Sequence, residues 1–349
     1  MEPLTHFLTG ACIGRSGPNR TTAYATLTLT LAAEFPDIDV LWNLKGPVQA
    51  LAHHRGFTHS LLGSPVDSLV VVGFVYALHR WRVHRGKSPP MPPRWGMLFL
   101  FGILATLSHI LLDFTNNYGV RPFMPFNWRW YSWDIVFIIE PLITLALLLG
   151  LILPAIFALV GSDMGARKEK FRGRWCATFA LIAVCAIWWI RDFEHRKAVT
   201  LLNSTDYRGE VVKSAAAMPY PVNPFMWAGI VETQSFYAKV PIDSRSYRTD
   251  PQDRAQYLYK PAETPITLAA KKSSLGRAYF DWSRYPYVET EALPAPQRGY
   301  DVNFRDLRFD YAPIKLGNSP TRTPLSADVI VDDKGRVLLM KMGNREEEP

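Results

Sequence analysis

The sequence predicts a mainly α-helical, polytopic membrane domain followed by a small β-rich soluble domain. Long apolar runs fill much of residues 60–190, whereas residues 200–349 are polar and rich in proline and aromatic residues. The C-terminal part contains strand-like runs, among them ADVIVDDKGRVLLMKM, in which a turn sequence joins two apolar runs. We therefore place a membrane-embedded domain at 1–195 and a β-rich domain at 196–349.

Four runs are long and apolar enough to cross a bilayer core, which needs about 20 residues. These four predicted spans are Leu61–His79, Gly96–Asp113, Ile135–Val160 and Trp175–Ile190. The region before them leaves two alternatives. Either 22–40 forms an extra span, or 3–16 and 22–36 form a helical hairpin buried against the other helices, with both ends on one side.

Two basic loops orient the predicted spans. HRWRVHRGKSPPMPPRW and GARKEKFRGR are rich in lysine and arginine, and the loops between them contain few basic residues. Because short cytoplasmic loops are enriched in lysine and arginine, we expect both basic loops in the cytoplasm and the C-terminal domain outside it. The formal charge of +8 then reflects topology in a multi-pass inner (plasma) membrane protein, and we expect no nucleic-acid partner.

Histidine and aspartate side chains gather at the outer ends of the apolar segments, where charge is costly. They come from FPDIDV, HHRGFTHS, LSHILLDF and SWDIVF, and the candidate ligands are Asp37, Asp39, His54, His59, His109, Asp113 and Asp134. Random placement would put about half of them on the inner side, so their convergence predicts one composite site. Histidine with carboxylate and no thiolate suits zinc, with manganese or iron as alternatives. The number of ligands allows two ions.

Arg55, Glu34 and Glu140 complete the candidate catalytic set. Arg55 is expected to hold an anionic oxygen of the substrate, and Arg121 is a second candidate for that role. Glu34 lies one helical turn before Asp37 and can join the site, and Glu140 lies within the third predicted span, nearly two turns beyond Asp134, where it can support the site. We assign none of them as the general base.

Each part of this pattern has a structural alternative. An Asp-x-Asp sequence is often a turn or a helix cap, and Asp134 can cap the helix that follows it. His109 and Asp113 lie on one helix face and can form a hydrogen bond between helices. The agreement of four separate regions favours a metal site over these alternatives.

The same motifs, in this order, resemble the YdjM-like family of inner-membrane proteins classed as metal-dependent hydrolases. The elements that carry the resemblance, over residues 1–160, are THFLTG, FPDID, HHRGFTHS, SHILLDFTNNYGVRPFMPF and WDIVFIIEP. It implies that the seven candidate ligands are shared site positions and adds His6 to them. In IIEP, Glu140 stands where similar sequences have aspartate. If His6 meets Asp37, the hairpin is favoured, because a single span would separate the two by a membrane thickness.

These expectations converge on a membrane-bound metal-dependent hydrolase. Its substrate would be a phosphoester of a lipid or lipid-linked molecule at the outer face. The alternative is a non-catalytic metal-binding or transport protein. It predicts acidic or histidine residues that continue through the spans to the inner side, and only Asp67 and His79 indicate this. A third possibility, a structural envelope protein, predicts that the cluster tolerates alanine.

Overall fold

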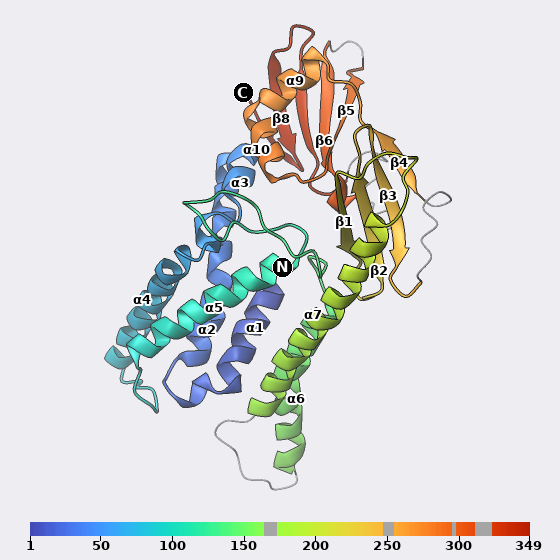
Figure 1. Ribbon diagram of the computed structural model, residues 1–349. Coiled ribbons are helices and arrows are strands. Elements are labelled where there is room, and N and C mark those ends of the chain that lie inside the picture. The colour runs from blue at the N-terminus through green and yellow to red at the C-terminus, as the bar shows by residue number, and fades with distance from the viewer. Residues whose placement is uncertain (164–172, 247–254, 295–297, 311–322) are drawn as a thin grey trace. The chain divides into compact units, whose positions relative to one another are not determined.

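The computed structural model describes residues 1–163, 173–246, 255–294, 298–310 and 323–349 (Figure 1). Two compact units are present, and neither is one continuous stretch of chain. The helical unit comprises Met1–Asp39, Arg55–Glu194 and Pro219–Pro224. The β-rich unit comprises Val40–His54, His195–Met218 and Phe225–Pro349.

The helical unit begins with a hairpin of α1 (Pro3–Ser16) and α2 (Ala25–Glu34), joined through the 3-10 turn η1 (Pro18–Arg20). The two helices approach closely because α1 has glycine at the contact. A Cβ atom at Gly10 would lie 2.5 Å from the carbonyl oxygen of Leu29. The structure therefore contains the hairpin rather than a single span over 22–40, and the 10 residues of α2 are too few to cross a bilayer.

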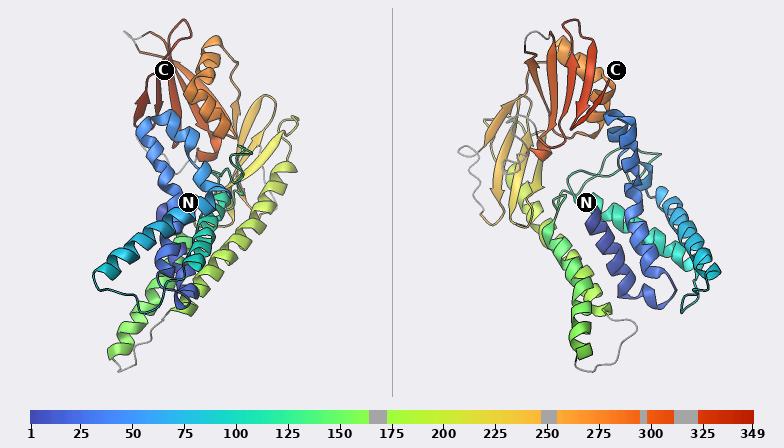
Figure 2. Two further views of the ribbon diagram at one scale, coloured as in Figure 1. Left: turned by 90° about the vertical axis from the view of Figure 1, so that its left-hand side faces the viewer. Right: turned by 180° about the vertical axis from the view of Figure 1, so that it is seen from behind.

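A second helix pair, α4 (Gly63–His84) and α5 (Trp95–Thr115), packs beside the hairpin (Figure 2). Gly102 lets α4 approach, and the Ser68 hydroxyl donates a 2.7 Å hydrogen bond to the Phe99 carbonyl. A shared core joins α2, α4 and α5 and consists of Leu29, Ala32, Ala33, Val71 and Ala105. This packing fixes the position of the C-terminal end of α5.

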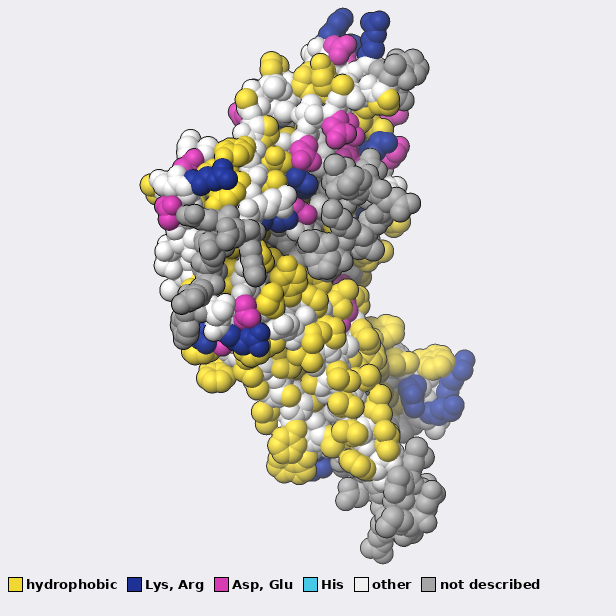
Figure 3. All heavy atoms as spheres, turned by 90° about the vertical axis from the view of Figure 1, so that its right-hand side faces the viewer, with side chains coloured by type: hydrophobic (Ala, Val, Ile, Leu, Met, Phe, Trp, Pro, Cys, Tyr) yellow, Lys and Arg dark blue, Asp and Glu magenta, His cyan; other side chains and the backbone are white. Residues whose placement is uncertain are grey.

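The last two helices of the unit are α6 (Pro141–Asp163) and α7 (Arg174–Asn203). α6 starts later than the predicted Ile135, because the Ile135 and Val136 amides both donate to the Thr115 carbonyl in an extended segment. α7 continues beyond the predicted end at Ile190. Figure 3 shows apolar side chains spread over the face of the helical unit that carries these helices, where the exposed residues include Leu145, Phe157, Phe179, Ile182 and Trp189.

Two helices, α5 and α7, are long and apolar enough to cross a membrane. A third crossing arises if Pro47–His59 and Gly63–His84, bent by 82°, act as one broken span. The described side chains of α6 extend to Phe157, which leaves an apolar helix just below the length of a span. The structure thus supports two or three candidate spans, and four spans stay a prediction.

The β-rich unit contains two antiparallel sheets. The first has the order β1 (Ser214–Pro219), β2 (Met226–Glu232), β3 (Phe236–Asp243), β4 (Gln256–Tyr259). The second has the order β5 (Pro286–Ala292), β6 (Tyr300–Asp306), β7 (Ala327–Val331), β8 (Val337–Met342), β9 (Arg345–Glu347). The hairpin predicted in ADVIVDDKGRVLLMKM is confirmed as β7 and β8.

Three helices accompany these sheets. α9 (Pro265–Lys272) and α10 (Ser274–Trp282) precede β5, and α10 packs against α3 (Pro47–His53), which comes from far earlier in the chain. The Val48 amide donates to the Glu347 carboxylate at 3.2 Å. The segment between Asp39 and Arg55 therefore folds with the C-terminal strands, a long-range association that the sequence pattern did not indicate.

Candidate metal centre

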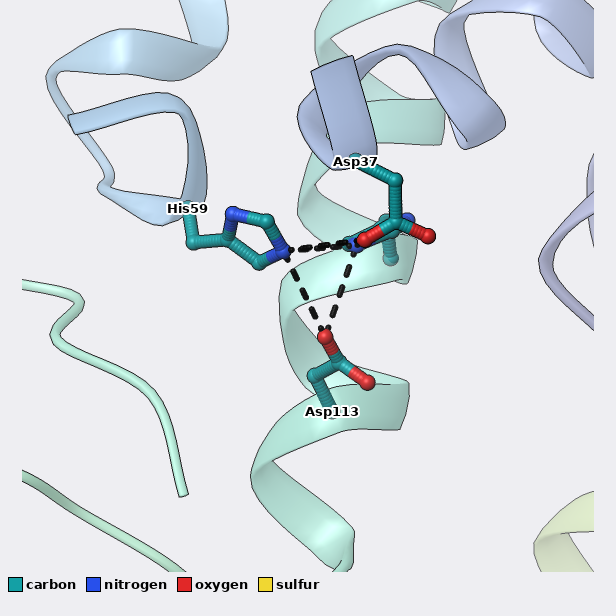
Figure 4. A group of neighbouring side chains, drawn as sticks. Asp37, His59 and Asp113 are labelled. Carbon is teal, nitrogen blue, oxygen red and sulfur yellow. Dashed lines mark hydrogen bonds and ion pairs between the residues drawn. The ribbon is translucent and has the colours of Figure 1, made fainter. Parts of the chain in front are cut away.

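Four predicted residues meet at one point in the helical unit: Asp37, His59, His109 and Asp113. Asp37 lies in the 3-10 segment η2 (Phe35–Lys45), His59 in the 3-10 turn η3 (Phe57–His59), and the other two in α5. Each offers one ligand atom, and these atoms all lie within 4.8 Å of one another. Figure 4 shows Asp37, His59 and Asp113 pointing toward one another.

Most distances between the ligand atoms of this group lie between 3.1 and 3.6 Å. The Nε2 atoms of His59 and His109 are 3.1 Å apart, and each lies 3.5 Å from Asp113 Oδ2. Asp37 Oδ1 lies 3.5 Å from His59 Nε2 and 3.6 Å from His109 Nε2. Three of the four side chains are fully buried, whereas the Asp37 side chain is 26% exposed, so the centre is open to its surroundings on the Asp37 side.

The surroundings of the two imidazoles favour their Nε2 atoms as acceptors. His109 Nδ1 lies 2.7 Å from the Ala33 carbonyl oxygen, which can only accept, so Nδ1 carries the proton. His59 Nδ1 lies 3.4 Å from Asp39 Oδ2, which favours the same tautomer. Asp113 Oδ2 is buried and has no hydrogen-bond donor among the described residues. Facing lone pairs and carboxylates need a cation between them, so these residues fit a divalent metal.

Arg55 holds the opposite side of Asp113. Its Nη2 donates to Asp113 Oδ1 at 2.9 Å, and its Nη1 donates to the Gly119 carbonyl at 2.9 Å and to Asn116 Oδ1 at 3.3 Å. The guanidinium also lies over the Tyr118 ring, 4.7 Å from its centroid. Both terminal nitrogens contact protein acceptors here, so Arg55 orients Asp113. The predicted contact of Arg55 with a substrate oxygen stays a prediction.

Asp39 and His6 lie around the four residues in supporting positions. Asp39 Oδ2 accepts a 2.6 Å hydrogen bond from the Arg55 amide, so this carboxylate fixes the η3 loop and faces the far nitrogen of His59. The His6 ring stacks on His109 at 3.7 Å, and its Nε2 lies 3.4 Å from Asp113 Oδ1. The Met1 amino group contacts the same oxygen and lies 3.0 Å from His6 Nε2.

The other predicted site residues are not among the four clustered ligands. Glu140 forms a buried 2.7 Å ion pair with Arg191 of α7. Asp134 is buried in the loop before α6, at a φ of 60°, several residues too early to cap that helix. Glu34 is the half-buried last residue of α2. His54 ends the segment that folds with the β-rich unit.

Sequence reasoning missed Asn116 and Tyr118. Both lie in FTNNYG, directly after Asp113, and both contact Arg55. Their position directly after the ligand Asp113, within the same sequence motif, could have indicated that they belong to the site. The Ala33 carbonyl that orients His109 has no such signal, because a backbone oxygen carries no residue type.

Buried histidine and carboxylate ligands at the ends of apolar helices define a membrane protein with a candidate metal centre. The family model of the YdjM inner membrane protein matches residues 1–195, and the chain belongs to this family. The chain is also 27% identical, over 158 residues, to the Bacillus subtilis (strain 168) protein named "Uncharacterized protein YfhP". That match covers 41% of this chain and 43% of the relative. No solved structure matches the chain.

Proposed function

We propose that this protein is a metal-dependent hydrolase of the inner membrane that cleaves a phosphoester of a lipid or lipid-linked substrate at the outer face. The observation that carries the proposal is the set of four ligand atoms within 4.8 Å, in which both imidazoles present Nε2 to the centre. Two nitrogens and two carboxylate oxygens suit zinc, with manganese or iron as alternatives. A second ion stays a prediction, because the Met1 amino group and Arg55 already contact Asp113 Oδ1, and the same amino group lies 3.0 Å from His6 Nε2.

A bound divalent metal would lower the pKa of a water molecule and polarise a phosphoryl oxygen. The protein's own residues prepare the centre for this chemistry. The Ala33 carbonyl and the Asp39 carboxylate orient the two imidazoles, and Arg55 holds Asp113 in place and offsets its charge. Because Asp37 is the one partly exposed ligand, we infer that the substrate approaches from its side.

Apolar side chains next to the ligands support a lipid substrate. Ile38 is 43% exposed and follows Asp37, and Phe57 is 41% exposed within the same turn as His59. Leu61 and Leu62 follow this turn and are each 49% exposed. Exposed apolar residues beside a polar centre favour a substrate that has an acyl or prenyl chain as well as a charged group.

The test is a hydrolysis screen with the full-length protein reconstituted in vesicles. Phospholipids and lipid-linked phosphoesters are the substrates, phosphoester cleavage is measured, and metal content is determined on the same samples. We expect His59→Ala to lose both metal and cleavage. The matched control is His53→Ala, which changes the neighbouring histidine that stacks on Trp42. Bound metal without cleavage of any substrate would contradict the hydrolase and favour a binding or transport protein.

A further inference from the structure

A pocket lies at the end of the helical unit that is remote from the candidate metal centre. It has a volume of about 650 Å³ and forms between the α1–α2 turn, the C-terminal end of α4 and the α4–α5 loop. The α4–α5 loop leads into the first residue of α5, whereas His109 and Asp113 belong to the last two turns of this helix. With a rise of 1.5 Å per residue, α5 separates the pocket from the metal centre by roughly 20–25 Å.

The lining of this pocket is basic and contains no acidic residue among the described residues. Its polar lining residues are Asn19, Arg20, Thr22, Tyr24, Thr26, Arg82 and Ser88. Arg20 and Arg82 are both exposed, so their guanidinium groups can reach a ligand from solvent or from a membrane surface. Guanidinium groups match phosphate oxygens in geometry and charge, and amide and hydroxyl groups add further hydrogen bonds.

The walls of the pocket are held together by specific contacts. The Arg94 amide donates to the Thr22 hydroxyl at 2.7 Å, which ties the α4–α5 loop to the hairpin turn. The Lys87 amide donates to the Arg82 carbonyl at 2.9 Å and closes the end of α4. These contacts therefore hold the segments that carry Arg20 and Arg82 at a fixed distance from each other.

Aromatic side chains gather at this end of the unit. Trp95 packs edge-to-face against Tyr76, at 5.0 Å, and against His79, at 5.5 Å. The Tyr24 hydroxyl lies 3.4 Å from His79 Nδ1, and Trp81 is 52% exposed. Tryptophan and tyrosine concentrate where the hydrocarbon core meets the headgroups, so the pocket lies at headgroup depth.

We propose that this pocket binds the phosphate of an anionic phospholipid headgroup, with Arg20 and Arg82 as the charged contacts. Basic pockets between helices at the membrane surface recognise such headgroups. The site differs from the metal centre in ligand, chemistry and position, so it does not depend on the proposed hydrolase activity.

The test compares ligands and variants in the full-length protein. The dissociation constant of short-chain phosphatidylglycerol is measured for the wild type and for Arg20→Gln with Arg82→Gln, beside phosphatidylcholine and inorganic phosphate. Each arginine contributes about 1 kcal/mol at a lipid surface, which is about fivefold in affinity, so the double variant should bind about 25-fold more weakly. Metal content serves as the folding check and should not change.

Arg80→Gln is the matched control, because Arg80 is exposed on the same helix and does not line the pocket. It should leave the affinity for phosphatidylglycerol unchanged. An equal loss in the control would show diffuse surface attraction and overturn the pocket. Equal affinity for inorganic phosphate, or for phosphatidylcholine, would overturn the assignment to an anionic headgroup.

Discussion

Replacing Asp113 with asparagine tests the candidate metal centre with a change of almost no volume. In Asp113→Asn, the retained oxygen can still accept from Arg55 Nη2, which lies 2.9 Å from Oδ1 in the wild type. The amide nitrogen then occupies the position of Oδ2, 3.5 Å from the Nε2 atoms of His59 and His109. A ligand oxygen thereby becomes an N–H donor directed at the metal position.

The size of the effect follows from the number of ligand atoms. Loss of a residue that only supports a ligand typically weakens metal binding 10- to 100-fold. Asp113 is one of four ligands and its replacement also removes a negative charge, so we expect a loss of at least about 100-fold. This corresponds to at least about 2.7 kcal/mol of metal-binding free energy.

The assay is a competition titration of the purified full-length protein against a chromophoric zinc chelator. The matched control is Asp67→Asn, because Asp67 is an equally buried acid of α4 that lies outside the cluster. The control should bind zinc as the wild type does. Zinc affinity of Asp113→Asn within threefold of the wild type, with an unchanged melting temperature, would refute the four-ligand centre.

Three further predictions concern stability, each measured on the full chain by thermal unfolding or tryptophan fluorescence. Glu140→Gln removes the negative charge that pairs with the buried Arg191 guanidinium at 2.7 Å and should cost about 3–5 kcal/mol; a loss no larger than the ~1 kcal/mol of an exposed ion pair contradicts this. Gly10→Ala should cost about 1–3 kcal/mol by overpacking, whereas Gly96→Ala, with open space around it, should not. Burial alone would raise the pKa of Asp306, but the Arg308 guanidinium lowers the pKa below its usual value, so the ionised carboxylate stabilises the fold above pH ~4. That contribution should disappear on further acidification. In Asp306→Asn, the free energy of unfolding should therefore depend less on pH in the acidic range.

The ligand types of the site could be predicted from the sequence, but not which of them meet. His109 and Asp113 are four residues apart on a helix, so helical geometry places both side chains on the same face. Asp37 and Asp39 are two residues apart in a 3-10 segment, and only Asp37 joins the cluster, while Asp39 accepts the Arg55 amide. Local spacing cannot decide this, because the direction of each carboxylate depends on the loop that packs against it.

Glu140 shows the same limit at long range. Its position beside an apolar segment indicated a buried carboxylate, and it is fully buried. Its partner Arg191 is 51 residues later, and nothing in the local sequence distinguishes an ion pair between helices from a place at the metal centre. The sequence therefore indicated that the Glu140 carboxylate is buried, but it could not identify Arg191 as the residue that pairs with it.

The sequence by itself determined the separation into apolar helices and a β-rich part, and the histidine and aspartate chemistry of the centre. These follow from periodicity, hydropathy and residue type, which are local properties of the chain. Only the tertiary structure decided that Asp37, His59, His109 and Asp113 converge while Asp39, Arg55 and Asn116 support them. Convergence depends on how η2 and η3 pack against α5, and that packing is set by contacts between residues far apart in the chain.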